Sequence, residues 1–374
     1  MLRREDLNTI GLEPLEDIAR DRDAAAYSLR ITSGTMGQEP ILFARRRAMP
    51  GETPWESYFY RGMQAPVIFA GNFSLRLRFV AGLLLDCAPE NRRILVLGAE
   101  DLNPKLDVIL RAFKPDCFYG IPSFMAKALE HVHDSEVRTG IRLVNMYGEF
   151  FTPELEALFR ARLPRAEFTT GYASAEGGLM SDHPCGYLAR QTYHPRPEVR
   201  VGVWEPDTDG VGELMVTSAW SPSVKIEQYL TGDLGRIVPG VCRCGRAEAF
   251  EVLGRKDAEV VRFMGATLRR EEFERVAKEL GAYVLDYRAT AREYLEDGRL
   301  AGEVRLDVVP TPQLSVLPDP EQFLASAFAE RLYVTPTRTL ADLIRSGILP
   351  PPEVHLVTLF PPEAKAVKLK KLHG

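Results

Sequence analysis

The sequence predicts a layered α/β domain, then a β-rich unit, then a small α+β domain at the C-terminus. Short apolar runs alternate with helical patterns in the first half, and the pattern changes at Glu198 and again after Leu253. At about 150 residues per domain, 374 residues suggest about two domains. The predicted domains are 1–254, with its β-rich part at 198–253, and 255–374.

Four short apolar runs in the first domain are interpreted as buried strands. They are Ala65–Ala70, Arg93–Gly98, Asp116–Tyr119 and Leu143–Tyr147. Each run is separated from the next by enough residues for a crossover connection. This arrangement predicts a parallel or mixed sheet inside an α/β layer.

Two helices are predicted around the last of these strands. Ser123–His131 carries Met125 and Leu129 at helical spacing. Thr152 has the side chain of an N-cap, and the proline and two glutamates that follow it suit the first turn of a helix. That helix is expected to end at about Leu163.

From Glu198 onward, turn signals separate short strand-like segments. They read EVRVGVW, DTDG, GELMVTS, VKIEQYL and GRIVPG. After the predicted boundary at Gly254–Asp257, we expect a helix, two strands, a proline-rich connection and another helix. The first three of these are Arg270–Leu280, Val284–Ala289 and Gly302–Val309.

Composition and charge exclude several classes of protein. Apolar residues make up 45% of the chain, which can supply a sizeable core and excludes global disorder. The net charge of −5 excludes the broad positive field that non-specific nucleic-acid binding requires. A charged N-terminus and the lack of a long apolar run predict a cytoplasmic protein that does not bind membranes. Five cysteines then indicate reduced thiols or a metal site, and Cys87 and Cys117 are expected in the core.

A glycine- and hydroxyl-rich segment near the N-terminus is a candidate phosphate-binding loop. Thr32–Gly37 holds two glycines and three hydroxyl residues between apolar segments, so backbone N–H groups and hydroxyls can surround an anion. The Gly-Lys-Ser/Thr ending of a Walker loop is absent. An ordinary hairpin turn is the alternative interpretation.

Three further segments combine residues that suit a nucleotide. Gly148 and Glu149 follow a predicted strand, and the loop from Gly171 to Gly178 joins an aromatic, a hydroxyl and a carboxylate. An aromatic ring can stack on a purine, and a carboxylate near phosphates can hold Mg²⁺. Asp233 is expected in a turn after an apolar strand end, where it can accept both ribose hydroxyls. A loop around one buried tyrosine and a capped turn are the alternatives.

The order of these motifs resembles that of the adenylate-forming superfamily, which includes acyl-CoA synthetases and firefly luciferase. The matching segments are TSGTMG, the GE after a strand, YxSxE, YLTGDLG, LGRKDxEVVRxxGxxLxxxEFE and EAKAVK. The Cys242–Arg246 insert and the EAKAV ending resemble those of phenylacetate-CoA ligases most closely. The resemblance spans about Ile31 to Lys371.

The resemblance implies a large domain that binds ATP and a carboxylic acid, and a C-terminal lid that rotates on a hinge. It implies catalytic roles for Lys365 and Glu176, with Glu176 also binding Mg²⁺, and a hinge at Asp257. The nucleotide-binding residues that it implies are Thr32, Ser33, Gly34, Thr35, Gly37, Gly148, Glu149, Tyr172, Ser174, Asp233 and Arg255. Among them, Gly148 and Glu149 would line the adenine, Tyr172 would stack on it and Asp233 would bind the ribose.

The chain departs from the family pattern at several positions. Ala173 replaces a glycine, the hydroxyl of Ser174 comes one place early, and Ala364 stands where a glycine normally precedes the lid lysine. Only about thirty residues precede the phosphate loop. Shortened relatives activate aromatic acids such as phenazine carboxylates, so a bulky aryl acid is the expected substrate.

The predicted function is ATP-dependent activation of this acid to an acyl-adenylate, with release of pyrophosphate and transfer to a thiol or amine acceptor. An aryl-CoA ligase of the phenylacetate type is one alternative, with CoA or an acyl carrier as the acceptor. A non-catalytic protein that binds nucleotide or acyl-AMP is the other. A homodimer is left open.

Four residues have the chemistry of a structural zinc site. They are Cys185, His194, Cys242 and Cys244, with His183 as a spare. A Cys-x-Cys pair, with a cysteine and a histidine about fifty residues upstream, supplies the three sulfurs and one nitrogen that such sites use. Free thiols in a turn are the alternative.

Overall fold

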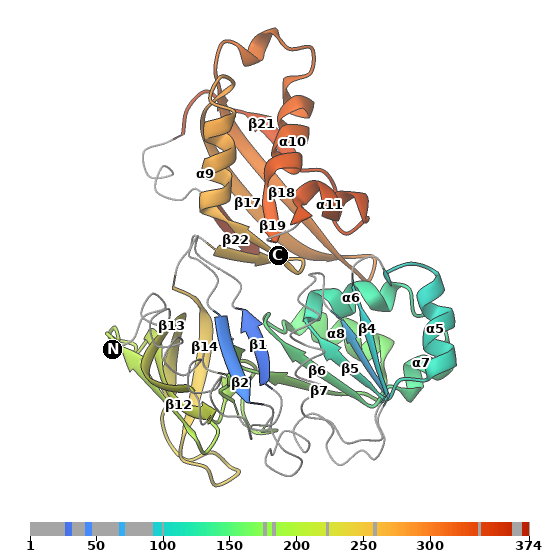
Figure 1. Cartoon of the computed structure of the whole chain (residues 1–374), viewed down its shortest axis with the longest axis vertical. Coiled ribbons are helices and arrows are strands. Elements are labelled where there is room, and N and C mark those ends of the chain that lie inside the picture. Colours follow the sequence, from blue (N-terminus) through green and yellow to red (C-terminus); the bar gives the residue numbers. More distant parts are fainter. Residues whose placement is uncertain are drawn as a thin grey trace.

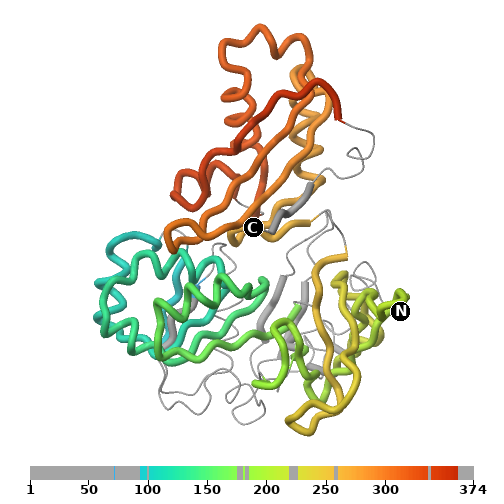
Figure 2. The backbone as a smooth tube through the Cα atoms, turned by 180° about the vertical axis from the view of Figure 1, so that it is seen from behind, coloured from blue at the N-terminus to red at the C-terminus, as the bar shows by residue number. Residues whose placement is uncertain are grey.

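The computed structural model describes most of the chain from residue 93 onward and three strands before it (Figures 1 and 2). The described residues are 27–31, 42–46, 67–71, 93–98, 101–174, 178–181, 185–221, 224–256, 260–335, 338–360 and 369–373. The first two strands, β1 (Tyr27–Ile31) and β2 (Leu42–Arg46), pair antiparallel. No helix in this described part is long and apolar enough to cross a membrane.

The predicted α/β layer is confirmed as a five-stranded parallel sheet of order β4-β3-β5-β6-β7. Its strands are β3 (Val67–Gly71), β4 (Arg93–Leu97), β5 (Cys117–Gly120), β6 (Leu143–Tyr147) and β7 (Glu167–Gly171). Four of them match the apolar runs of the sequence within two residues. Cys117 is buried in β5, as predicted, whereas Cys87 lies outside the described residues.

Within the described residues, four helices accompany this sheet. They are α5 (Lys105–Phe113), α6 (Pro122–Glu130), α7 (Ser135–Gly140) and α8 (Pro153–Arg162). Both predicted helices are confirmed: at the start of α8 the Thr152 side chain accepts a hydrogen bond from the Leu155 N–H, and Leu163 follows as the C-cap. Phe118, Phe124 and Phe159 are fully buried between these helices and the sheet.

The β-rich unit is an antiparallel sheet of order β10-β14-β13-β12-β11. Its strands are β10 (Thr192–Tyr193), β11 (Val199–Trp204), β12 (Gly212–Ser221), β13 (Val224–Val238) and β14 (Ala249–Arg255). The short hairpin of β8 (Ala173–Ser174) and β9 (Gly178–Leu179) lies between β7 and this sheet in the sequence.

The prediction that Asp233 lies in a turn was wrong. Asp233 lies inside the single strand β13, which runs continuously through the two segments predicted as separate strands. Gly232 has a φ of +74°, so the strand bends there without ending. A glycine signals a bend and a turn in the same way, because both require a positive φ.

The C-terminal part begins with the hairpin of β15 (Val260–Phe263) and β16 (Ala266–Arg269), followed by α9 (Arg270–Glu279). Its main sheet has the order β21-β18-β17-β22, from β17 (Val284–Glu296), β18 (Arg299–Pro310), β21 (Glu353–Leu356) and β22 (Leu369–His373). The remaining elements are a 3-10 turn at Leu314–Val316, α10 (Pro320–Arg331), β19 (Tyr333–Thr335), β20 (Arg338–Thr339) and α11 (Leu340–Arg345). Strands β17 and β18 extend beyond the predicted segments.

The C-terminal part packs against the parallel-sheet layer (Figures 1 and 2). Strand β18 contacts α6, and the Arg162 guanidinium donates to the Gly298 carbonyl at 3.4 Å, at the tip of the β17–β18 hairpin. Figure 1 shows the α/β layer and the β-rich sheet side by side below the C-terminal elements. The boundary at 254–257 stays a prediction, because residues 257–259 lie outside the described part.

Candidate active site

Three predicted nucleotide-binding residues meet in one hydrogen-bonded group. The Tyr172 hydroxyl donates to Asp233 Oδ2 at 2.6 Å, and Arg255 Nη1 donates to Asp233 Oδ1 at 2.9 Å. Strand register explains the second contact, because Asp233 of β13 and Arg255 of β14 are direct cross-strand partners. A carboxylate can accept about four hydrogen bonds, so Asp233 retains capacity for ribose hydroxyls.

The charges within this group reinforce one another. Burial, and then the Asp233 carboxylate, raise the pKa of Tyr172 well above its usual value, so the phenol stays protonated and donates. Burial alone would lower the pKa of Arg255, but the attraction of Asp233 outweighs it and the pKa is raised. The two shifts therefore keep the Tyr172 phenol neutral and the Arg255 guanidinium charged.

A residue that the sequence analysis missed, Glu213, supports the bend that carries Asp233. Its carboxylate accepts from the Gly232 N–H at 3.0 Å and pairs with Lys256 Nζ at 2.8 Å. Glu213 is only 8% exposed, and the Lys256 N–H also donates to the Gly232 carbonyl at 2.8 Å. Nothing local marks Glu213, because it starts an ordinary strand and its partners are distant in the sequence.

Glu149 caps a helix in this structure. Its Oε2 accepts from the Ser123 N–H at 3.0 Å, at the second residue of α6. The N-cap position, Ile121, has no side-chain oxygen to offer, so the carboxylate reaches it from a segment 26 residues away. Gly148, with a φ of +77°, turns the chain away from β6 and directs Glu149 to this position.

Replacing Glu149 by alanine should lower the free energy of unfolding by about 1 kcal/mol, because α6 loses its only side-chain cap and a negative charge at its N-terminus. Glu149→Gln should recover part of the loss, since the amide oxygen still accepts. Urea titration followed by circular dichroism measures both changes. Glu330→Ala is the control, since that side chain is 70% exposed, lies near the C-terminus of α10 and is 4.0 Å from Arg331. Equal stability of Glu149→Ala and Glu330→Ala would contradict the capping role.

A cation of the C-terminal part faces the same region. Arg262 of β15 interacts electrostatically with Glu149 and Asp233, and with the guanidinium groups of Arg255 and Arg269. The Arg262 side chain donates to the Thr267 hydroxyl across the β15–β16 hairpin. Arg262 therefore adds positive charge within electrostatic range of Asp233 and Glu149, which suits an anionic ligand.

The Tyr172 ring packs in a cluster of aromatic side chains. It stacks on Tyr193 with ring centroids 6.3 Å apart, and it meets Phe250 edge-on at 5.7 Å. Stacking on Tyr193 covers one face of the Tyr172 ring, and the hydrogen bond to Asp233 holds its hydroxyl in place. Stacking of Tyr172 on adenine stays a prediction.

Several predicted site residues lie outside the described part of the chain. They are Thr32, Ser33, Gly34, Thr35, Gly37, Glu176, Asp257 and Lys365. The strands that flank the first loop pair with each other, with Ile31 opposite Leu42, so the loop joins a hairpin. Ser174, in β8, is half-buried beside the segment that contains Glu176. The roles predicted for all of these residues stay predictions.

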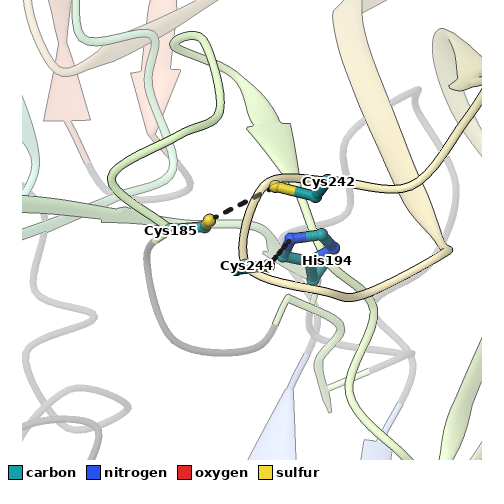
Figure 3. Close-up of side chains that lie close together, drawn as sticks. All are labelled: Cys185, His194, Cys242 and Cys244. Carbon is teal, nitrogen blue, oxygen red and sulfur yellow. Dashed lines mark hydrogen bonds between the residues drawn. The ribbon is translucent and has the colours of Figure 1, made fainter.

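The four predicted metal ligands come together. The Sγ atoms of Cys185, Cys242 and Cys244 and one ring nitrogen of His194 all lie within 4.8 Å of one another (Figure 3). Cys242 and Cys244 lie between β13 and β14, and His194 follows β10 of the same sheet. The ion would therefore hold strands of the β-rich sheet and the Cys185 segment together, and would not join two domains.

Two solved structures have folds similar to that of this chain. 2-Hydroxyisobutyryl-CoA ligase, in complex with 2-HIB-AMP and CoA in the thioesterification state, matches 100% of this chain and 80% of its own, with a TM-score of 0.66 and 17% identity. A second structure, IdnL1, matches 81% of this chain and 64% of its own, with a TM-score of 0.52 and 20% identity. No protein-family model and no curated protein matches the sequence.

The chain therefore has the fold of 2-hydroxyisobutyryl-CoA ligase, and the α/β fold class that the sequence predicted is confirmed. The closer resemblance to phenylacetate-CoA ligases stays a prediction.

Proposed function

We propose that this protein is an adenylate-forming ligase that activates a carboxylic acid with ATP and then transfers the acyl group to a thiol. The observation that carries the proposal is the Tyr172–Asp233–Arg255 group, which lies in an adenylate-forming fold at the motif positions where the family binds nucleotide. The Asp233 carboxylate suits the hydroxyl groups of a ligand, and the cations Arg255 and Arg262 suit its negative charge. AMP combines these two features.

In the first step, a carboxylate oxygen of the substrate forms a bond to the α-phosphorus of ATP, and the bond from that phosphorus to the bridging oxygen breaks. Pyrophosphate leaves with the electron pair. Negative charge grows on the phosphate oxygens in the transition state, and the ammonium group of Lys365 is assigned to stabilise it. Asp233 and Arg255 orient the nucleotide throughout.

Mg²⁺ is the metal that such phosphate chemistry requires, and it shields the charge of the leaving pyrophosphate when bound. Carboxylate oxygen is its preferred protein ligand, and Glu176 is the residue assigned to it. In the second step, the sulfur of CoA or of an acyl-carrier thiol attacks the acyl carbon, and AMP leaves with the electrons of the broken acyl–oxygen bond.

We propose a bulky aryl carboxylate as the substrate, because the Cys242–Arg246 insert and the EAKAV ending resemble those of phenylacetate-CoA ligases. Acid-dependent exchange of labelled pyrophosphate into ATP tests the first step directly. We expect exchange with at least one member of a panel of aryl acids, and little with short aliphatic acids.

The alternative is a protein that binds nucleotide without turning it over. Binding of ATP in a calorimeter, with no exchange for any acid of the panel, would favour that alternative. Exchange with aliphatic acids alone would retain the ligase and overturn the aryl assignment.

A further inference from the structure

Four potential metal ligands converge beside the β-rich sheet from three separate segments. Cys185 Sγ lies 3.7 Å from Cys242 Sγ, and Cys244 Sγ lies 3.2 Å from His194 Nε2. Figure 3 shows the four side chains close together, with these two contacts drawn as dashed lines. No other group of three or more potential ligands gathers in this way among the described residues.

Two of the six spacings between these atoms match a tetrahedral metal centre. Zinc–sulfur bonds of about 2.3 Å and zinc–nitrogen bonds of about 2.0 Å give tetrahedral edges of about 3.8 Å between sulfurs and about 3.5 Å between sulfur and nitrogen. The Cys185–Cys242 and Cys244–His194 distances lie within a few tenths of an ångström of these values, and the other spacings are 4.8 Å or less. A disulfide would need the sulfurs at about 2.05 Å, so Cys185 and Cys242 are free thiols that lie close enough to share an ion.

The orientation of His194 is a second and independent observation. Its ring is buried, with 2% of the residue exposed, and Nδ1 bonds to the backbone carbonyl of Glu248. A carbonyl can only accept, so Nδ1 carries the proton and Nε2 presents its lone pair toward Cys244. A backbone carbonyl that fixes the tautomer in this way is typical of a histidine that binds a metal.

The turn from Cys242 to Arg246 brings the thiols of Cys242 and Cys244 to the same side. The Gly245 N–H donates to the Cys242 carbonyl at 2.8 Å, and the Cys242 N–H donates to the Arg246 carbonyl at 2.8 Å. Gly245 has a φ of +89°, which a side chain would strain. This tight turn is then tied to the histidine segment by Arg246, which donates to the Pro195 carbonyl at 2.8 Å.

We propose that Cys185, His194, Cys242 and Cys244 bind one structural zinc ion, and that this ion positions the Tyr172 side of the nucleotide site. Three thiolates and one imidazole complete a closed tetrahedron with no position for substrate, which is the ligand set of structural zinc. The metal site depends only on its own geometry. Its effect on nucleotide affinity rests on the proposed function.

Two routes lead from the ligands to Tyr172. Through side chains, Tyr193 precedes ligand His194, and its ring stacks on Tyr172. Through the backbone, the Arg196 N–H donates to the Met180 carbonyl at 3.1 Å, and the neighbouring Ser181 hydroxyl accepts from the Tyr172 N–H at 2.9 Å. Loss of the ion should therefore loosen the Tyr172 ring and its hydrogen bond to Asp233.

The first test is elemental analysis of the full chain purified without chelator. We expect one zinc per chain, and its loss in the Cys242→Ser, Cys244→Ser double variant together with a melting temperature lower by about 5 °C or more. Arg243→Ala is the matched control, since it changes the same turn and leaves both thiols. Substoichiometric zinc in the wild type, a different metal, or a Cys185–Cys242 disulfide found by mass spectrometry would overturn the site.

The second test avoids variants that fail to fold. Zinc is removed from the wild-type protein with a chelator and then restored, and hydrogen exchange is followed by mass spectrometry. We expect faster exchange in peptides covering 180–196 and 240–250, unchanged exchange in 300–330, and recovery with zinc. Uniform loss of protection, or none, would contradict the positioning role.

Nucleotide affinity separates the metal site from the proposed function. Calorimetry with ATP should show several-fold weaker binding to the zinc-depleted protein than to the restored protein. Equal affinity in a protein that binds one zinc would overturn the positioning role and retain the site. A protein that binds zinc but no ATP in either form would contradict the proposed function, while metal content and exchange still decide the metal site.

Discussion

Replacement of Lys365 by alanine should slow the formation of the acyl-adenylate by about 100-fold or more, because one well-placed cation that stabilises transition-state charge has an effect of this size. The same variant should consume a supplied acyl-adenylate at nearly the wild-type rate, since the C-terminal lid is expected to rotate between the two half-reactions and to present a different face for the transfer. Pyrophosphate exchange measures the first half-reaction. Thioester formation from synthetic acyl-adenylate measures the second.

Lys368→Ala is the control for this experiment. Both lysines belong to the same basic segment, so a general role of its charge would make the two variants behave alike. We expect Lys368→Ala to retain both half-reactions. Equal losses in the two half-reactions of Lys365→Ala would count against the assigned role, because they would indicate a defect that is not specific to adenylation.

Asp233→Asn should weaken ATP binding by about 10- to 100-fold, which corresponds to the loss of a charge-assisted hydrogen bond of about 1.5–3 kcal/mol. Asparagine has nearly the shape of aspartate and can still accept from Tyr172, so the fold should survive. The loss of charge removes the partner of Arg255, whose guanidinium is 2.9 Å away. Isothermal calorimetry with ATP measures the change in affinity, and circular dichroism verifies the fold.

Tyr172→Phe separates ribose binding from packing. Phenylalanine keeps the ring in contact with Tyr193 and Phe250 but removes the hydrogen bond to Asp233. We expect Tyr172→Phe to weaken ATP binding less than Asp233→Asn does. Unchanged affinity in Asp233→Asn would sink the ribose assignment. Equal effects of the two variants would show that Asp233 acts through Tyr172.

The fold class could be predicted because its signals are local. Apolar runs of strand length mark β3 to β6, and the Thr152 cap with its proline marks the start of α8, all within a few neighbouring residues. The long hairpin of β17 and β18 was predicted only in part. The residues near its tip carry mixed polarity, and their pairing follows from register through the turn at Asp297 and Gly298, both with positive φ.

The candidate site was less accessible to sequence reasoning. The types of residue were visible, and so were the four cysteine and histidine ligands, because zinc chemistry selects sulfur and imidazole whatever the fold. The contacts that hold the site residues could not be predicted from the sequence. Glu213 lies 19 residues from Gly232, whose N–H it binds, and Glu149 lies 26 residues from Ser123.

Local patterns in the sequence predict a layered α/β domain with a β-rich unit, and they show which residue types are available for nucleotide and metal chemistry. Periodicity, caps and residue chemistry are properties of neighbouring residues. The folded chain alone shows that Asp233 lies within a strand beside Arg255, that Glu149 caps α6 and that the Tyr193 ring stacks on Tyr172. These contacts depend on strand register and on which elements pack together, and both are set by the whole core.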